Sequence, residues 1–175
     1  GAETVPNALA TGRGSAFAVD AETTATGAFD DASASMLGGV TVTDNTEDAP
    51  VARETAGGDV LVWTPPERTY SADADVERCD AVAPVAHLVA ELALDGRYAG
   101  ATTVNGLAFP TALGVSPERA VETVGDAAGV SLSGTGPSVV AVGGRTETER
   151  VRDRWNDREG TTWLTTTRTD GARTT

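Results

Sequence analysis

Two hydrophobic patterns divide the chain into predicted strands and helices. Apolar residues alternate with polar ones, or run briefly between turn residues, in six predicted strands: 16–26, 40–43, 59–64, 130–133, 138–142 and 161–167. Apolar residues recur at spacings of three and four from Val76 to Ala93, which predicts a helix. Cap and turn residues predict further helices: 98–113, one opening at 116–118, and 146–156.

Turn chemistry predicts one more short helix and two irregular segments. Asp30 or Asp31 can cap a helix that the Gly38-Gly39 pair would end. The acidic stretch 44–58 is typical of a loop, and 168–175 is typical of a tail.

The order of these elements favours an α+β fold. From Asp59 onward the predicted order is strand, helices, strand, strand, helix, strand. This order resembles a split βαβ arrangement, with helices on one face of a mostly antiparallel sheet.

The composition limits the cellular setting and the classes of partner that we expect for this chain. The 175 residues carry 26 acidic and 13 basic side chains, a net charge of -13, which argues against nucleic acid and anionic membranes as partners. No apolar run approaches the roughly 18 residues that cross a membrane. We expect a reducing cytoplasm, adapted to high salt, because exposed carboxylates repel one another less where salt screens them. The alternative is that the acidic excess arose by ordinary sequence drift and reflects no adaptation to salt.

Missing residue types exclude several kinds of chemistry. All 13 basic residues are Arg, so the lysine of P-loop nucleotide sites, the phosphate-binding lysine of protein kinases and Schiff-base catalysis are ruled out. Cys79 and His87 are the single Cys and His, which excludes an internal disulfide or a Cys-rich zinc site. Eight residues apart on a predicted helix, they would be about 12 Å apart, too far for a catalytic dyad.

Three segments carry candidate chemistry, and each has a structural alternative. The Ser133-Gly134-Thr135-Gly136-Pro137-Ser138 segment can form an anion nest or a tight turn between strands. The adjacent carboxylates of Asp30 and Asp31 can supply a base or a metal ligand, or can stabilise a helix N-terminus. Residues 7–15 offer an amide, a hydroxyl and a guanidinium from Asn7, Thr11 and Arg13, or form a polar surface loop. Arg13 can hold a carboxylate through two hydrogen bonds.

Together these segments resemble the archaeal-type shikimate kinases of the GHMP kinase superfamily. The resemblance rests on GAFDDASASMLGGVTVTDN (27–45), GVSLSGTGPSVVAV (129–142) and the opening 26 residues, with SADADVERCDAVAP and NGLAFPTALG in support. The family has a long segment with a Ser-rich ATP loop of PxxxGLxSSSA type before the GAFDD motif. Here Thr26 runs directly into Gly27, and no such string occurs elsewhere.

The resemblance implies a fold and a reaction. Residues 1–45 would be a truncated ribosomal-S5-like N-terminal remnant, and 46–175 a ferredoxin-like (split βαβ) C-terminal domain. ATP and Mg²⁺ would bind between them, and shikimate would be phosphorylated on its 3-hydroxyl. Either Asp30, which we prefer, or Asp31 would be the catalytic base. The implied ATP-binding residues are Ser133, Gly134, Thr135, Gly136 and Ser138, and the implied substrate-binding residues are Asn7, Thr11 and Arg13.

Two other functions remain open at this point. Another GHMP kinase activity, such as homoserine kinase, would use the same motifs. A non-catalytic small-molecule or partner-binding module would keep the fold without the Ser-rich ATP loop. The sequence leaves the metal ligands and the oligomeric state open, and it predicts impaired catalysis by this chain alone.

Overall fold

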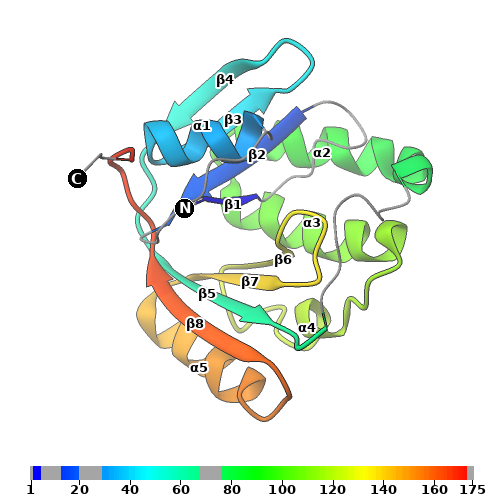
Figure 1. Ribbon diagram of the computed structural model, residues 1–175, viewed down its shortest axis with the longest axis vertical. Helices are drawn as coiled ribbons and strands as arrows, with labels where there is room; N and C mark the ends of the chain where they lie inside the picture. Colours follow the sequence, from blue (N-terminus) through cyan, green and yellow to red (C-terminus); the bar gives the residue numbers. More distant parts are fainter. Residues whose placement is uncertain (1, 5–12, 20–28, 68–75, 173–175) are drawn as a thin grey trace.

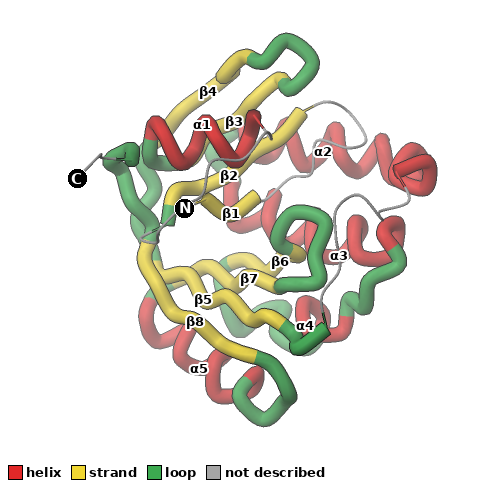
Figure 2. The backbone as a smooth tube through the Cα atoms, viewed as in Figure 1, coloured by secondary structure: helices red, strands yellow, loops and turns green. Residues whose placement is uncertain are grey.

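The computed structural model describes residues 2–4, 13–19, 29–67 and 76–172. Eight described strands form two four-stranded sheets, and every pair of neighbouring strands is antiparallel. The sheets lie one above the other, with helices on their outer faces and at one side (Figures 1 and 2). The expected mixed α+β class is thereby confirmed.

The upper sheet has the order β1-β2-β3-β4. Its strands are β1 (Ala2–Thr4), β2 (Arg13–Ala18), β3 (Val40–Asp44) and β4 (Ala49–Glu54). Helix α1 (Phe29–Leu37) packs against β2 and β3 and ends, as predicted, at Gly38 and Gly39, whose φ angles are 74° and 77°. Such left-handed angles favour glycine, which explains the stop.

The lower sheet has the order β6-β7-β5-β8. Its strands are β5 (Asp59–Thr64), β6 (Gly129–Leu132), β7 (Val139–Gly143) and β8 (Thr161–Thr166). The helices are η2 (Val76–Val82), α2 (Ala83–Leu94), α3 (Tyr98–Leu113), α4 (Glu118–Val121) and α5 (Arg145–Trp155). The predicted order of elements from Asp59 onward is confirmed. No helix in the described ranges is long and apolar enough to cross a membrane.

Both faces of the lower sheet are covered. Leu61 and Trp63 of β5 share a core cluster with α4 and α5, whereas Val60 and Val62 contact Val19 and Val40 of the upper half. Helix α3 packs against β6, where the amide of Asn105 donates to the Ser131 hydroxyl. The Ser131 side chain lies on the same face of the lower sheet as Val140, and Leu61 lies on the opposite face. The expectation that all helices lie on one face is therefore wrong.

The loop predicted at 44–58 contains a strand, β4. Its side chains are exposed or half-buried throughout, so no alternation marked it in the sequence. Pairing with β3 creates it, with a register shift between Val42 and Thr43. The upper sheet thus continues past residue 45, and the chain crosses to the lower sheet between Glu54 and Asp59.

The predicted tail is also ordered as far as Ala172, in a segment that we name the C-terminal strap (Thr167–Ala172). The amide of Arg168 donates to the Ala18 carbonyl at 2.9 Å, and the Gly39 amide donates to the Arg168 carbonyl at 2.7 Å. The Arg53 guanidinium donates to the carbonyls of Leu37, Gly38 and Thr169. The strap therefore joins the end of the lower sheet to the upper half (Figure 1).

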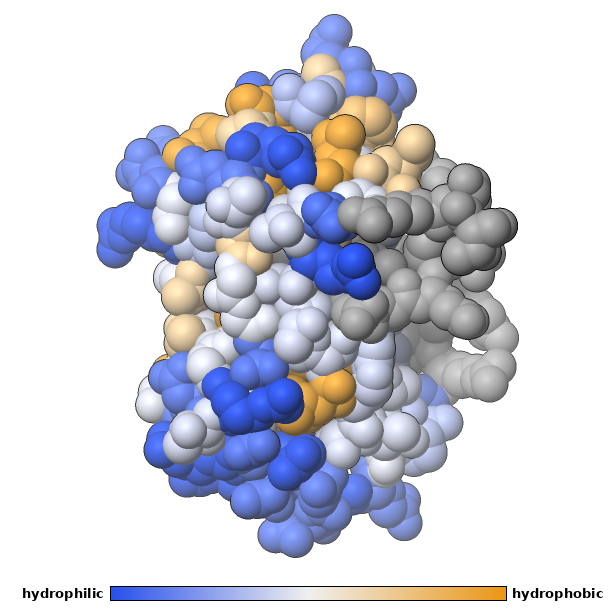
Figure 3. Space-filling model, turned by 90° about the vertical axis from the view of Figure 1, so that its left-hand side faces the viewer, coloured by the Kyte–Doolittle hydropathy of each residue, from blue (hydrophilic) through white to orange (hydrophobic). Residues whose placement is uncertain are grey.

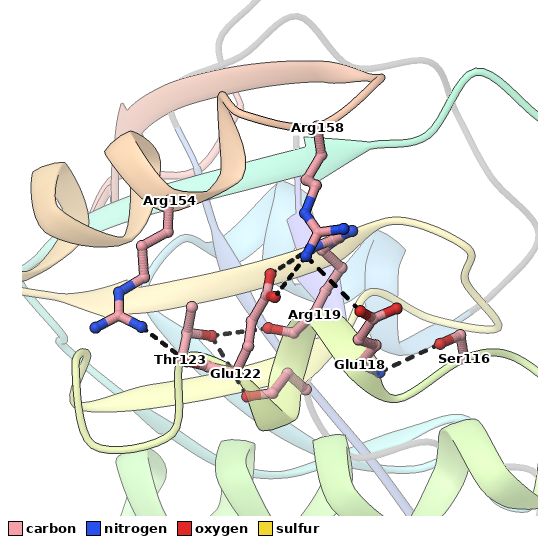
Figure 4. Close-up of polar contacts among 8 residues, drawn as sticks. Ser116, Glu118, Arg119, Glu122, Thr123, Arg154 and Arg158 are labelled. Atoms are coloured by element: carbon pink, nitrogen blue, oxygen red, sulfur yellow. Dashed lines mark hydrogen bonds and ion pairs between the residues drawn. The ribbon is translucent and has the colours of Figure 1, made fainter.

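Charged side chains connect α4 with the end of α5 (Figure 4). Arg158 Nη2 lies 3.8 Å from Glu118 and 3.7 Å from Glu122, and Arg119 pairs with Glu122. Arg154 donates to the Glu122 carbonyl. Because most of these groups are partly exposed, each pair contributes at most about 1 kcal/mol.

Candidate active site

Asp30 is buried between α1 and the upper sheet. It lies in the first turn of α1 and is 5% exposed, whereas Asp31 is half-buried. A Cβ atom on Gly14 of β2 would lie 2.7 Å from Asp30 Oδ2. The glycine thus leaves the space that this carboxylate occupies. Both acidic residues also lie where the positive end of the helix dipole stabilises a negative charge.

A group of buried hydroxyls surrounds this position. The Ser33 hydroxyl donates to the Asp30 carbonyl and lies 3.1 Å from the Thr41 hydroxyl. Thr43 donates to the carbonyl of Gly14 and to Asn45. The sequence analysis did not single out Ser33, Thr41 and Thr43. The sequence feature that could have identified them is the alternation of Thr with Val in β3, together with the small residues of α1. This pattern places a polar face of the strand against a polar face of the helix.

Arg13 lies beside a carboxylate of its own chain. Arg13 and Asp44 are opposite each other on β2 and β3, and their charged atoms are 3.1 Å apart. Hydrogen bonds from Thr46 lower the pKa of Asp44, and the Arg13 charge lowers it further. Arg13 thus holds the kind of anion that the sequence predicted, but the carboxylate is Asp44. Asn7 and Thr11 lie outside the described residues.

The Gly-rich segment forms the connection between β6 and β7. The Ser133 amide donates to the Ser138 carbonyl at 2.9 Å, and the Gly136 amide donates to the Ser133 carbonyl at 2.8 Å. Gly134 and Gly136 have φ angles of 55° and 79°. The tight-turn interpretation is therefore confirmed, and the anion-nest interpretation stays a prediction.

The two glycines of this turn differ in their surroundings. A Cβ atom on Gly136 would lie 2.8 Å from the Leu132 side chain, whereas one on Gly134 would meet no heavy atom within 4 Å. The backbone at Gly134 is therefore open to the approach of a bulky group. A hollow of about 230 Å³, lined in part by Pro137, Trp63 and Arg119, lies beside the turn.

The candidate residues belong to two different sheets. Asp30 and Arg13 belong to the upper half, and the Gly-rich turn belongs to the lower sheet. The core formed by Val19 and Val40 with Val60 holds the two halves together. A carboxylate on one half and a glycine turn on the other can serve a proton transfer and an anion, respectively.

Solved structures with the same fold are kinases. The homoserine kinase of Cytophaga hutchinsonii superposes with a TM-score of 0.59, at 13% identity, over 81% of this chain and 52% of that one. The thrB protein of Listeria monocytogenes gives 0.56, at 16% identity, over 82% and 54%. At such identity the likeness shows that the chain shares the fold of these homoserine kinase structures, and nothing finer.

Curated proteins of higher identity are shikimate kinases. The chain is 57% identical to a shikimate kinase of Halobacterium salinarum over 156 residues, which are 89% of the chain and 55% of the relative. It is 48% identical to a shikimate kinase of Methanothrix thermoacetophila over 144 residues, 82% of the chain and 50% of the relative. The chain is therefore similar to archaeal shikimate kinases over most of its own length, and it spans about half the length of these relatives. No established family profile matches it.

Proposed function

We propose that this chain carries part of an ATP-dependent kinase that phosphorylates the 3-hydroxyl of shikimate. The observation that carries the proposal is the 57% identity over 156 residues to a shikimate kinase. The structural neighbours that are named homoserine kinase are only 13–16% identical to this chain, so they do not support homoserine as its substrate.

In this proposal Asp30 accepts the proton of the attacking hydroxyl. The oxygen of that hydroxyl bonds to the γ-phosphorus of ATP, the bond to the bridging oxygen breaks, and ADP leaves. Phosphoryl transfer depends mainly on positioning and charge stabilisation, so one fixed carboxylate is sufficient. Packing against Gly14 fixes Asp30, whereas Asp31 is half-buried, which supports Asp30 as the base.

The Gly-rich turn is the proposed phosphate-side element. The residues assigned to ATP are Ser133, Gly134, Thr135, Gly136 and Ser138. The open space at Gly134 supports a close approach of phosphate to the backbone there. In the described ranges no three His, Cys, Asp or Glu side chains are grouped to hold a metal. Mg²⁺ would bind together with the nucleotide phosphates, as is usual in kinase sites.

Arg13, Asn7 and Thr11 are proposed to lie on the shikimate side. Arg13 would exchange Asp44 for the substrate carboxylate, with which its planar guanidinium can form two hydrogen bonds.

We assign the upper half to an S5-like remnant and the lower sheet to a ferredoxin-like domain. The strand order β6-β7-β5-β8 with intervening helices supports the second assignment. The boundary that fits the sheets lies at 55–58, after β4.

This chain alone is expected to be inactive. The Ser-rich loop that the family resemblance implies is absent from its sequence, and a net charge of -13 repels a triphosphate. We expect ATP to bind at millimolar affinity or weaker, about -4 kcal/mol or less. The assay is coupled ADP release with shikimate, ATP and Mg²⁺ in molar KCl, with homoserine as the control substrate.

A chimera provides the positive arm of this test. It inserts, between Thr26 and Gly27, a segment with the Ser-rich ATP loop that the family resemblance implies. We expect shikimate-dependent turnover, which Asp30→Asn lowers about 10²- to 10⁴-fold at an unchanged melting temperature. Loss of activity with Asp31→Asn instead would reassign the base, and turnover with homoserine alone would refute the proposed substrate.

A further inference from the structure

A cavity of about 380 Å³ lies between the two halves, away from the Gly-rich turn. Val142 and Gly143 at the end of β7 line it, whereas the turn precedes Val139 at the start of β7. Four steps along a strand separate these two ends by roughly 13 Å. The beginning of β5 and the ends of β7 and β8 lie on the left in Figure 1, the side that faces the viewer in Figure 3. The cavity is therefore separate from the Gly-rich turn, and neither Asp30 nor Arg13 lines it.

The wall of the cavity is mostly apolar and comes from both halves. Val40 contributes from the upper sheet, Val142 from the lower sheet and Tyr98 from α3. Gly57 in the crossing segment also lines it, and a Cβ atom there would meet no heavy atom within 4 Å. The cavity is in the size range in which proteins enclose small organic molecules.

Two carboxylates give the cavity a charged end. Asp59 and Glu147 line it, and Arg145 lies 3.7 Å from Asp59. Arg145 offsets the charge of Asp59, so Glu147 supplies the net negative charge. Glu147 accepts a hydrogen bond from the Gly144 amide at 2.7 Å, so the N-terminus of α5 already holds an anion. A second anion would meet repulsion there, whereas a cation would be attracted.

We propose that this cavity binds a small organic cation with an apolar, ring-shaped body. Its ammonium group lies at Glu147, and its ring lies against Val40 and Val142. Because the wall includes Thr167 of the strap as well as residues of both sheets, the bound cation contacts the upper sheet, the lower sheet and the strap together. It therefore stabilises the folded chain according to its concentration relative to its dissociation constant. This inference does not depend on the proposed kinase activity.

The test uses three probes of similar shape and different charge. Phenethylamine is a cation at pH 7, 2-phenylethanol is neutral and 3-phenylpropionate is an anion. We expect saturable binding of the amine at about 1 mM or tighter, measured by chemical shifts of backbone amides lining the cavity and by thermal shift. The alcohol should bind at least threefold more weakly, and the acid should not bind.

Two variants and one matched control locate the site. Gly57→Leu fills the cavity from a position without a positive φ, and it should weaken amine binding at least tenfold. Gly100→Leu, also at a glycine with open surroundings but outside the cavity lining, is its matched control and should bind as the parent does. Glu147→Gln keeps an acceptor for the Gly144 amide and should bring amine affinity down to that of the alcohol.

Three results would each overturn the proposal. These are absence of saturable amine binding up to 10 times the expected dissociation constant, equal binding of the acid, and unchanged amine binding in Glu147→Gln. If Gly57→Leu fails to fold, the Glu147→Gln comparison decides alone.

Discussion

At the scale of single residues, Gly14 and Asp30 illustrate how a close approach fixes a candidate catalytic group. Any side chain at Gly14 would come within 2.9 Å of both Oδ2 and Cβ of Asp30. Since Cβ belongs to the helix-anchored part of Asp30, α1 itself would have to shift. The position of the carboxylate therefore depends on a residue of another strand.

Gly14→Ala should destabilise the fold by about 1–3 kcal/mol, because overpacking forces backbone shifts. Urea unfolding in molar KCl measures this change. Gly100→Ala is the control, because its added methyl group meets open space and alanine stabilises a helix interior by about 0.5–1 kcal/mol. Equal effects of the two substitutions would contradict the close packing of Gly14 on Asp30.

Tyr98 gives a prediction for high pH. Burial, a hydrogen bond to Glu54 and the Glu54 charge together raise the pKa of Tyr98 to about 12, and burial is the largest of these causes. The folded chain thus keeps this proton where the unfolded chain loses it, above pH 10. The stabilisation is complete below pH 10 and is lost as the pH rises through about 12.

Absorbance at 295 nm across an alkaline titration should show one tyrosine ionising near 12. Tyr98→Phe should abolish that step and leave the signal of Tyr70. Glu54→Gln should move the pKa of Tyr98 back toward 10, and an unmoved midpoint would show that Glu54 plays no part.

Parts of the candidate site were predictable from single residues, and parts were not. The glycines of the β6–β7 turn were identifiable because their conformations restrict residue choice. The surroundings of Asp30 were not, because strands far apart in sequence must pair before Gly14 can pack on Asp30 and Thr41 can contact Ser33 beside it. The same holds for Arg13, whose partner Asp44 is 31 residues away along the chain and opposite it in the sheet.

At the scale of elements, local signals located most helices and strands. Helix α3 has the bounds predicted from its flanking turns, and α1 ends at its two glycines. Strand β4 and the C-terminal strap carry no such signal, because both are held by backbone hydrogen bonds to distant segments. Sequence patterns record which face of a segment is buried, and these two segments bury little.

Arg53 should stabilise the strap more than any ordinary surface arginine does. Its guanidinium donates to three carbonyls, from α1, from Gly38 and from the strap. Arg53→Ala should cost about 1–2 kcal/mol and should speed hydrogen exchange at the Arg168 and Ala172 amides.

Arg150→Ala, at an exposed position of α5, is the matched control and should change stability by less than about 0.5 kcal/mol. Arg53→Lys should lie between the two, since an ammonium group cannot span the same carbonyls. Unchanged exchange in Arg53→Ala would show that the backbone contacts alone hold the strap.

At the scale of the whole molecule, surface charge governs the response to salt. Hydrophilic side chains cover much of the face in Figure 3, most densely at the lower end, where α5 lies in Figure 1. Ion pairs such as Arg154–Asp126 are partly exposed, and salt weakens them. The excess of 13 negative charges is screened at the same time, and this effect should be larger.

The melting temperature should therefore rise by at least about 5 °C between 0.1 and 2 M KCl. A double variant, Glu77→Gln with Asp80→Asn, removes two exposed charges and should show a smaller rise. A melting temperature that is flat or falls with salt would contradict the salt-adapted interpretation.

The C-terminal strap has a consequence for synthesis on the ribosome. Strand β5 is central in its sheet, yet its neighbours β7 and β8 emerge about 75 and 97 residues later in the chain. The strap emerges last of all the described segments and contacts Ala18 and Gly39, made among the first. A nascent chain that lacks β8 therefore leaves one edge of β5 unpaired, and a chain that lacks Thr167 onward also lacks the hydrogen bonds by which the strap joins Ala18 and Gly39.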